Sequence, residues 1–402
     1  MKKIETIIVG AGMSGLSCAL RLHKLGREYL IIEEANHVGG RIHSVYEQGY
    51  IFDQGFQVYN TAYKHGESIL DYQKLDLRHF EPGAKIYHNS NFEIIHDPLK
   101  DISKIYQTLI SNTSNFLDKL KIIKMIVQLY NYNLSKDLQK DTSTLYFLKE
   151  YGFSDKFINN FFKPFFGGIF LEKELSTSAN FFKFVFSNFR LGSACVPRLG
   201  MQKIPDQIYE KLDVGSVLLN TKVKSINNNV LFTNRDVKYK AKNIVFTSNS
   251  QNIINPKSLK YNSVLCYYFV SHSDIEHSKY IYLFPEEDYI NNIAILNSVS
   301  EKYAPDHVKL FSITILAYNE SEIKTIKMLK NRLSMFFGGK LEDYEYLKHF
   351  KILNGTLKQP RGHSFYSLNK TKDYIIAGEQ MTNASIDGAI ESGIIAAKKV
   401  LN

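Results

Sequence analysis

The start of the chain alternates between short apolar runs and one amphipathic segment. Residues 7–9 form a continuous apolar run of the kind that makes a buried strand, and residues 29–32 form a second one. Between them, residues 16–25 carry apolar side chains at helical spacing. A strand, a helix and a second strand in this order predict the opening unit of an α/β domain.

Further along the chain, alternating apolar and polar residues predict two more groups of strands, separated by a long helical region. Residues 76–95 have strand-like alternation. Residues from about 98 to 190 are predicted to be mostly helical, with breaks near 112–115, 141–143 and 152. The strands predicted after residue 200 lie at 217–226, 230–232, 243–247, 265–270, 280–284 and 310–317, and the helices at 206–212 and 320–337.

A glycine-rich turn, GAGMSG, joins the first strand to the helix and fits the pattern GxGxxG. Gly10 permits the tight turn, Gly12 lets a backbone approach a pyrophosphate, and Gly15 lets the helix pack closely on the strand. Met13 and Ser14 lie at the N-terminal end of the helix, which faces the phosphates. The pattern alone is weak evidence, but on a strand, turn, helix and strand it predicts a dinucleotide-binding site.

An acidic residue and a second pair of glycines extend this site. Glu33 ends the second strand, 23 residues after the first glycine of the turn, where an acid accepts hydrogen bonds from ribose hydroxyls. The adjacent Glu34 is the alternative acceptor. Gly39 and Gly40 follow in the segment VGGR and continue the anion-binding surface. Arg41, which ends that segment, can give two donors to a phosphate.

The order of GxGxxG, an acid and GGR resembles the flavin-containing amine oxidase superfamily, which includes phytoene desaturases and protoporphyrinogen oxidases. The resemblance implies FAD rather than NAD, and it favours Glu33 because the distance of that residue from GGR matches the family pattern. In the family, an FDxG stretch after GGR approaches the flavin ring. The matching stretch lies within residues 49–57, a predicted strand that breaks at a glycine, so Gly55 and Phe56 are predicted contacts.

Three later segments extend the resemblance over the whole chain. Residues 198–205 resemble the GGM-x-x-(L/I)-P segment of the desaturase and protoporphyrinogen oxidase branches, although Leu199 replaces the first glycine. Within TKVKSI, Val223 matches a valine whose backbone lies against the adenine. The ending AGE and GAIESG predicts a strand, a loop and a helix whose N-terminal amides point at the flavin, where negative charge develops on reduction. The contacts predicted in this ending are Gly378, Glu379, Gly388 and Ala389.

The resemblance implies an α/β fold, α+β overall, with two domains. A Rossmann-like FAD-binding domain is assembled from discontinuous segments, and a substrate-binding domain carries a mixed sheet and a helical cap. The predicted FAD-binding domain comprises residues 1–75, 200–252 and 365–402. The predicted substrate-binding domain comprises residues 76–199 and 253–364, with its helical region at about 98–190.

The composition is that of a folded globular protein and gives no sign of a metal site, a disulfide framework or nucleic-acid binding. The 402 residues are 44% hydrophobic and 22% charged, which is ordinary for a folded globular chain long enough for two cores. Cys18, Cys195 and Cys266 show no metal-ligand or CxxC spacing, so we expect no metal site and no disulfide framework. The net charge of +10 reflects a lysine-rich composition without an arginine-rich run, so nucleic acid is not an expected partner.

The N-terminus and the length of the apolar runs indicate where the protein is located. Met1 leads almost directly into the first strand, so we expect no signal peptide, and no apolar run is long enough to span a bilayer. These features predict a cytoplasmic protein. Residues 119–135 are basic at their start and apolar almost all round, which fits either a buried cap helix or peripheral contact with the inner face of a membrane.

The segment FINNFFKPFFGGIF, residues 157–170, is crowded with phenylalanine, and Pro164 and the two glycines are expected to interrupt its helix. Such aromatics suit either the wall of a pocket for an apolar substrate or a plain aromatic core. The chain contains no second GxGxxG, which argues against a separate NADPH domain. We expect FAD to be bound non-covalently because no cysteine follows Cys266.

These features favour an FAD-dependent oxidoreductase that removes hydride from a C–H bond of an apolar substrate, as a desaturase or oxidase, with O2 or a quinone as electron acceptor. The alternatives are a flavin amine oxidase, which oxidises a primary or secondary amine with O2, and a non-catalytic FAD-containing carrier. The sequence does not identify catalytic residues. Lys358 and Tyr366 precede the C-terminal motif and are candidates, but solvated loop positions are the better interpretation.

Overall fold

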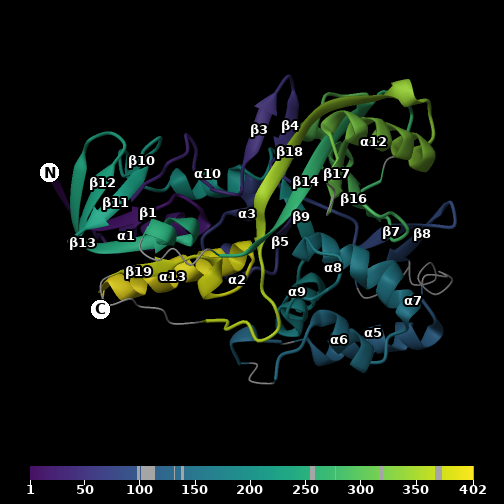
Figure 1. The fold of residues 1–402 in the computed structure, drawn as a ribbon, viewed down its shortest axis with the longest axis horizontal. Helices are drawn as coiled ribbons and strands as arrows, with labels where there is room; N and C mark the ends of the chain where they lie inside the picture. Colours follow the sequence, from purple (N-terminus) through teal and green to yellow (C-terminus); the bar gives the residue numbers. More distant parts are fainter. Residues whose placement is uncertain are drawn as a thin grey trace.

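The computed structural model describes residues 1–96, 100, 114–130, 132–136, 140–253, 259–276, 278–316, 320–366 and 374–401. Its largest elements are two seven-stranded sheets (Figure 1). The strands of the first sheet are β1 (Lys2–Val9), β2 (Tyr29–Ile32), β10 (Val217–Leu218), β11 (Val223–Asn227), β12 (Val230–Thr233), β13 (Lys238–Thr247) and β19 (Ile375–Ala377).

In the first sheet, β1 lies between β2 and β13, and both neighbours run parallel to it. β13 is long enough to pair twice along its other edge, antiparallel with β12 near its start and parallel with β19 near its end. Three chain segments that are distant in sequence therefore meet in one sheet. These segments lie within the pieces expected to form the FAD-binding domain, and the domain boundaries themselves stay a prediction.

Two helices pack together beside this sheet, α1 (Met13–His23) and α13 (Ile386–Leu401) (Figure 1). A Cβ on Gly393 would lie 2.1 Å from the backbone oxygen of Ser14, so only glycine permits this approach. The first helix starts at Met13, three residues before the predicted start, because the second half of the glycine turn is already helical. α10 (Lys203–Tyr209) also starts earlier than predicted, since Pro205 is tolerated in a first turn.

The second sheet has the order β18, β14, β17, β16, β15, β7 and β8, and all neighbours are antiparallel except β15 and β7. This is the expected mixed sheet. α12 (Glu322–Phe337) packs its buried Leu329, Leu333 and Phe336 in the same apolar cluster as Phe311 of β17. The strands are β7 (Gly83–His88), β8 (Asn91–His96), β14 (Tyr261–Ser271), β15 (Ile281–Leu283), β16 (Ile290–Ile295), β17 (Lys309–Ile315) and β18 (Tyr344–Leu357).

The rest of the chain outside the helical region forms two small sheets and several short helices. The remaining strands are β3 (Ser44–Glu47) with β4 (Tyr50–Asp53), and β5 (Tyr59–Asn60), β9 (Ala194–Pro197) and β6 (Leu77–His79). The short helices are α2 (Lys64–Glu67), α3 (Tyr72–Leu75), α11 (Leu296–Val299), η2 (Leu134–Lys136), η4 (Ser248–Ile253), η5 (Glu301–Tyr303), η6 (Leu341–Asp343) and η7 (Glu379–Met381).

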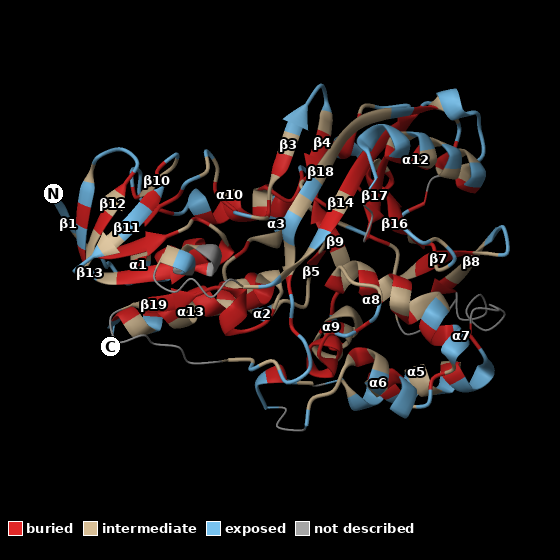
Figure 2. Ribbon diagram, in the orientation of Figure 1, coloured by how far each residue is buried: buried red, intermediate tan, exposed pale blue. Residues whose placement is uncertain are grey.

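The predicted helical region is confirmed where the chain is described, although residues 101–113 at its start lie outside the described residues. It packs around buried phenylalanines, and Figure 2 shows the buried residues continuing from the sheets into these helices. In the described part of the chain, no helix is long and apolar enough to cross a bilayer. The helices are α5 (Phe116–Gln128), α6 (Thr144–Glu150), α7 (Asp155–Phe157), η3 (Ile158–Phe162), α8 (Lys163–Phe170) and α9 (Ala179–Leu191).

The prediction that Pro164 and the two glycines interrupt a helix is wrong. Pro164 lies in the first turn of α8, and the π-helical turn η3 leads directly into it, which accommodates the missing N–H and the bulk of the ring. Gly167 and Gly168 lie inside α8, where they allow close approach to neighbouring chain. A Cβ on Gly168 would lie only 2.6 Å from the side chain of Asn291 in β16.

The α/β fold class, α+β overall, is confirmed by this arrangement and by the similarity to solved structures described below.

Candidate functional site

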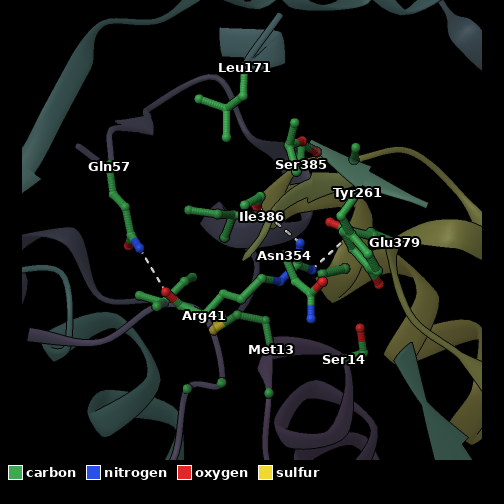
Figure 3. Close-up of a pocket in the computed structure, with 18 of the residues that line it drawn as sticks. Met13, Ser14, Arg41, Gln57, Leu171, Tyr261, Asn354, Glu379, Ser385 and Ile386 are labelled. Atoms are coloured by element: carbon green, nitrogen blue, oxygen red, sulfur yellow. Dashed lines mark hydrogen bonds and ion pairs between the residues drawn. The ribbon is translucent and has the colours of Figure 1, made fainter. Parts of the chain in front are cut away.

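One cavity of about 810 Å³ connects the first sheet with the second sheet and the helical region. Its first end lies where β1, β2 and β13 finish, and its other end is walled by α8, α9, β15 and β16. Ligands of open parallel sheets bind outside the carboxyl ends of the strands, so the first end has the expected place for a nucleotide. Figure 3 shows Met13, Ser14, Arg41, Glu379, Ser385 and Ile386 around this cavity.

The glycine turn forms the first end of the cavity. Gly10 has a φ of +106°, and a Cβ there would meet the Thr247 hydroxyl at 2.2 Å. Gly12 is the N-cap of α1, no side chain caps the helix there, and a Cβ on Gly12 would meet no atom within 4 Å. The first amides of α1, from Met13 and Ser14, therefore border open space, which is the geometry of an anion site at a helix N-terminus.

Glu33 is held between the glycine turn and the end of β2. Its carboxylate accepts hydrogen bonds from the backbone N–H of Ala11 at 2.6 Å and from that of Ala35 at 2.8 Å. The residue is buried, whereas the side chain of Glu34 is exposed and pairs with Lys222 at 3.0 Å. Both acids line the cavity, but only Glu33 has a fixed position beside the turn. The geometry therefore supports the predicted preference for Glu33.

Arg41 joins the N-terminal motif to the C-terminal one. Its guanidinium lies 2.7 Å from a carboxylate oxygen of Glu379, 3.3 Å from the backbone oxygen of Gly355 and 5.5 Å from the ring centre of Tyr261. Burial disfavours the charge, but the acidic group of Glu379 and the Tyr261 phenol outweigh it and raise the pKa of Arg41. Gln57 donates to the backbone oxygen of Arg41 at 2.7 Å, which fixes the segment (Figure 3).

The cavity brings together most of the predicted site residues. Those that line it are Gly10, Gly12, Met13, Ser14, Glu33, Gly39, Gly40, Arg41, Phe56, Val223, Glu379 and Ala389. Gly15, Gly55, Gly378 and Gly388 lie outside the lining. A Cβ on Gly15 would meet the Gly10 oxygen at 2.0 Å and one on Gly388 would meet the Asn383 oxygen at 2.3 Å, while Gly55 and Gly378 have positive φ. These four glycines shape the loops around the cavity.

Several lining residues were not identified from the sequence. Tyr261 opens β14, and Asn354 and Thr356 lie near the end of β18, at places that only the pairing of distant strands brings to the cavity. The candidates Lys358 and Tyr366 do not line it. Lys358 is exposed, and the Tyr366 hydroxyl donates to Glu391 at 3.1 Å. The preference for loop roles at these two positions agrees with this placement.

The far end of the cavity is apolar. Phe165 and Ile169 of α8 face it together with Phe181, Val185 and Phe189 of α9. The predicted alternatives for residues 157–170 are both partly correct, because Phe157, Phe162, Phe166 and Phe170 pack in the core instead. Among the described lining residues, none of those from α8, α9, β15 and β16 is ionisable.

Two adjacent amides of β16, those of Asn291 and Asn292, are buried at this apolar end. Asn291 donates from Nδ2 to the backbone oxygen of Pro164 at 2.9 Å and to Oδ1 of Asn292 at 3.0 Å. Because the Pro164 oxygen can only accept, these contacts fix the orientation of both amides. Nδ2 of Asn292, a residue that lines the cavity, has no hydrogen-bond partner in the described part of the chain.

The fold and the cavity combine a glycine turn at a helix N-terminus, a buried acid beside it and an adjoining apolar chamber, an arrangement that is typical of dinucleotide-binding proteins. Residues 13–259 match the model for the flavin containing amine oxidoreductases, which is more than half of the chain. The chain belongs to this family, and membership supports a flavin as its cofactor.

Matches to individual proteins are shorter or more distant. The chain is 28% identical over 120 residues to all-trans-retinol 13,14-reductase of Danio rerio, which is 29% of this chain and 19% of that protein. It is 28% identical over 108 residues to phytoene desaturase of Cercospora nicotianae, covering 23% and 17%. The matches thus span about a fifth or less of these relatives. Putrescine oxidase bound to putrescine has the same fold, with a TM-score of 0.72, 16% identity and 99% of both chains covered.

Proposed function

We propose that this protein is an FAD-dependent oxidoreductase that removes hydride from a C–H bond of an apolar substrate, as a desaturase or oxidase. The observation that carries the proposal is one cavity with a cofactor cradle at one end and, at the other, a chamber whose described walls from α8, α9, β15 and β16 hold no ionisable side chain. A bound flavin supplies the chemistry of accepting the hydride. The chain would hold the substrate and the flavin in position and surround them with apolar side chains and fixed charges.

The residues fit this cofactor in a definite order. Gly10, Gly12 and the first amides of α1 would hold the pyrophosphate, and Glu33 would accept from the ribose. Val223 lines the same end and is proposed to place its backbone against the adenine. Gly55, Gly378 and Gly388 shape the loops beside the cavity, and the proposed contacts nearer the flavin ring and ribityl chain are Gly39, Gly40, Arg41, Phe56, Glu379 and Ala389.

The apolar chamber selects the substrate class. Burying an unpaired charge is costly, and the described walls from α8, α9, β15 and β16 offer a protonated amine no carboxylate. An uncharged, extended or flat molecule would instead gain from contact with Phe165, Phe181 and Phe189. This supports a polyene, or the apolar ring of a porphyrinogen whose propionate groups stay outside the chamber, over an amine. The electron acceptor is proposed to be O2 or a quinone.

The substrate class is tested by anaerobic mixing of the FAD-loaded protein with a detergent-solubilised carotenoid precursor, a porphyrinogen or a set of primary and secondary amines. We expect loss of the visible flavin absorption with an apolar compound and reoxidation by a quinone or O2. Reduction by amines alone, with release of peroxide when O2 is then admitted, would establish the amine oxidase alternative. A flavin that light cannot reduce anaerobically would instead indicate a non-catalytic carrier.

The flavin is proposed to be held without a covalent bond. Cys18, Cys195 and Cys266 are fully buried in the core, and neither a cysteine nor a histidine occurs among the described lining residues. Acid precipitation should therefore release all of the flavin into the supernatant, measured by its fluorescence. Flavin that stays with the protein pellet would contradict this prediction. Three free, buried thiols also support the proposed cytoplasmic localisation.

A further inference from the structure

Helix α5 exposes an apolar face that the proposed function does not use. Phe116 and Val127 are 66% and 71% exposed, and three apolar side chains between them, Leu117, Leu120 and Ile123, are exposed as well. The exposed apolar residues of this segment are Phe116, Leu117, Leu120, Ile123, Val127 and Tyr130. Phe116, Leu120, Ile123 and Val127 recur at intervals of four, three and four residues, so they form one stripe along the helix, and Tyr130 follows its end. Figure 1 places α5 at the outer edge of the helical region.

The opposite face anchors the helix to the rest of the protein. Met125 is fully buried and Ile126 nearly so. Asp118 forms a capping box with Asn115, and its carboxylate also accepts from the backbone N–H of Ser154 at 2.9 Å and from its hydroxyl at 2.5 Å. With one face fixed against α7, the stripe is directed away from the molecule. The exposure of the stripe is thus a consequence of how the helix is anchored.

Lysines flank the stripe. At 100° per residue, Lys119 lies on one side of it and the exposed Lys124 lies on the other, whereas Lys121 lies nearer the anchored face, where its ammonium donates to the backbone oxygen of Gly152. Asp118, the single acid of α5, is fully buried on the anchored face. The exposed surface of the helix therefore combines large apolar side chains with positive charge and carries no negative charge. This combination is typical of helices that lie in the headgroup region of an anionic bilayer.

We propose that α5 docks the protein on an anionic lipid surface, with the stripe buried among the headgroups and the lysines at phosphate level. The helix is about 20 Å long, too short to cross the hydrocarbon core, so it lies in the plane of the interface. A second copy of the chain is the less suitable occupant, because the two lysine-flanked stripes would repel each other. The inference goes beyond the proposed oxidoreductase function and does not depend on it.

The test is cosedimentation of the FAD-loaded protein with phosphatidylcholine vesicles, with and without phosphatidylglycerol. We expect binding to the mixed vesicles, weakened by salt. The double variant Leu120→Ser, Val127→Ser should lower the binding constant by about tenfold or more. Lys124→Glu, which changes an exposed lysine beside the stripe, should weaken the preference for the anionic lipid. The matched control is Ile323→Ser on α12, an apolar residue that is 80% exposed, and it should bind as the wild type does.

Two results would overturn the proposal. One is equal binding of the wild type and the stripe variant to anionic vesicles. The other is a dimer, measured by light scattering without lipid, that the stripe variant converts to a monomer. Flavin content and reduction of the flavin by a detergent-solubilised substrate are measured for every variant, so a failure of docking is distinguished from a failure of the proposed function.

Discussion

Replacing Gly12 by aspartate is expected to abolish retention of FAD. Gly12 is the N-cap of α1 with an extended backbone, φ −70° and ψ 178°, and a Cβ there would project into open space. Aspartate is a favoured N-cap, so its carboxylate would accept hydrogen bonds from the first amides of the helix. It would then occupy the place proposed for the pyrophosphate and repel it. A like-charge contact of this kind costs several kcal/mol, so FAD should bind roughly a hundredfold more weakly or worse.

The same geometry supplies the controls. Because aspartate caps the helix, the Gly12→Asp protein without flavin should unfold at the same temperature as the wild-type apoprotein or slightly higher. Gly12→Ala adds one methyl group that meets no protein atom within 4 Å, so it should fold normally and lose only part of the affinity. Flavin content is measured by absorbance after gel filtration. A Gly12→Asp protein that is yellow and stoichiometric would refute the assignment of this cavity end.

The predicted contacts that lie in one continuous segment of the sequence also lie together in the structure. The glycine turn, Glu33 and the GGR segment lie within about forty residues, and their backbone geometry follows from local steric rules. The structure places all of them except Gly15 at one end of the cavity. Gly15 has the packing role that the motif predicts for its third glycine, against the backbone of Gly10.

Contacts between segments that are distant in the chain could not be predicted from the sequence. Arg41 and Glu379 were both predicted as site residues, but nothing in the local sequence indicates that they pair. Glu379 follows β19, and β19 comes after all the strands of the second sheet in the chain. Tyr261 reaches Arg41 through the same long-range assembly. The phenylalanine tract shows a different limit, because helical spacing predicts an apolar face without telling which neighbour covers it. Phe165 faces the cavity while Phe166, the next residue, is buried in the core.

Asp53, on β4, is expected to make the stability of the native protein fall as pH rises from about 4 to about 6. Its carboxylate is 2% exposed and accepts from the Ser44 hydroxyl at 2.5 Å, the Met201 N–H at 3.0 Å and the Tyr303 hydroxyl at 2.7 Å. Burial raises its pKa from 3.8 to about 6, against the opposing effect of these three donors. Its backbone oxygen also accepts from the hydroxyl of Tyr268 of β14, so Asp53 connects β4 with the second sheet.

The native protein loses stability as the pH rises because its folded and unfolded states bind different numbers of protons. Between its two pKa values the folded carboxyl keeps a proton that the unfolded chain has released, so the native state is destabilised as the pH rises through this window. The rise in the pKa of Asp53 from 3.8 to about 6 corresponds to about 3 kcal/mol in the free energy of unfolding. In Asp53→Asn this contribution is absent. The free energy of unfolding of the wild type minus that of the variant, from urea titrations, should therefore fall by about 3 kcal/mol between about pH 4 and pH 7.

A second variant separates this mechanism from a general effect of mutation. Tyr303 is fully buried, and burial and the charge of Asp53 raise the pKa of its phenol, so the hydroxyl stays protonated and donates to the carboxylate. Removing that donor in Tyr303→Phe disfavours the ionised carboxyl further, and the fall in stability should move to higher pH and grow larger. A difference between wild type and Asp53→Asn that is constant with pH, or a Tyr303→Phe curve with an unchanged midpoint, would show that Asp53 does not titrate in this range.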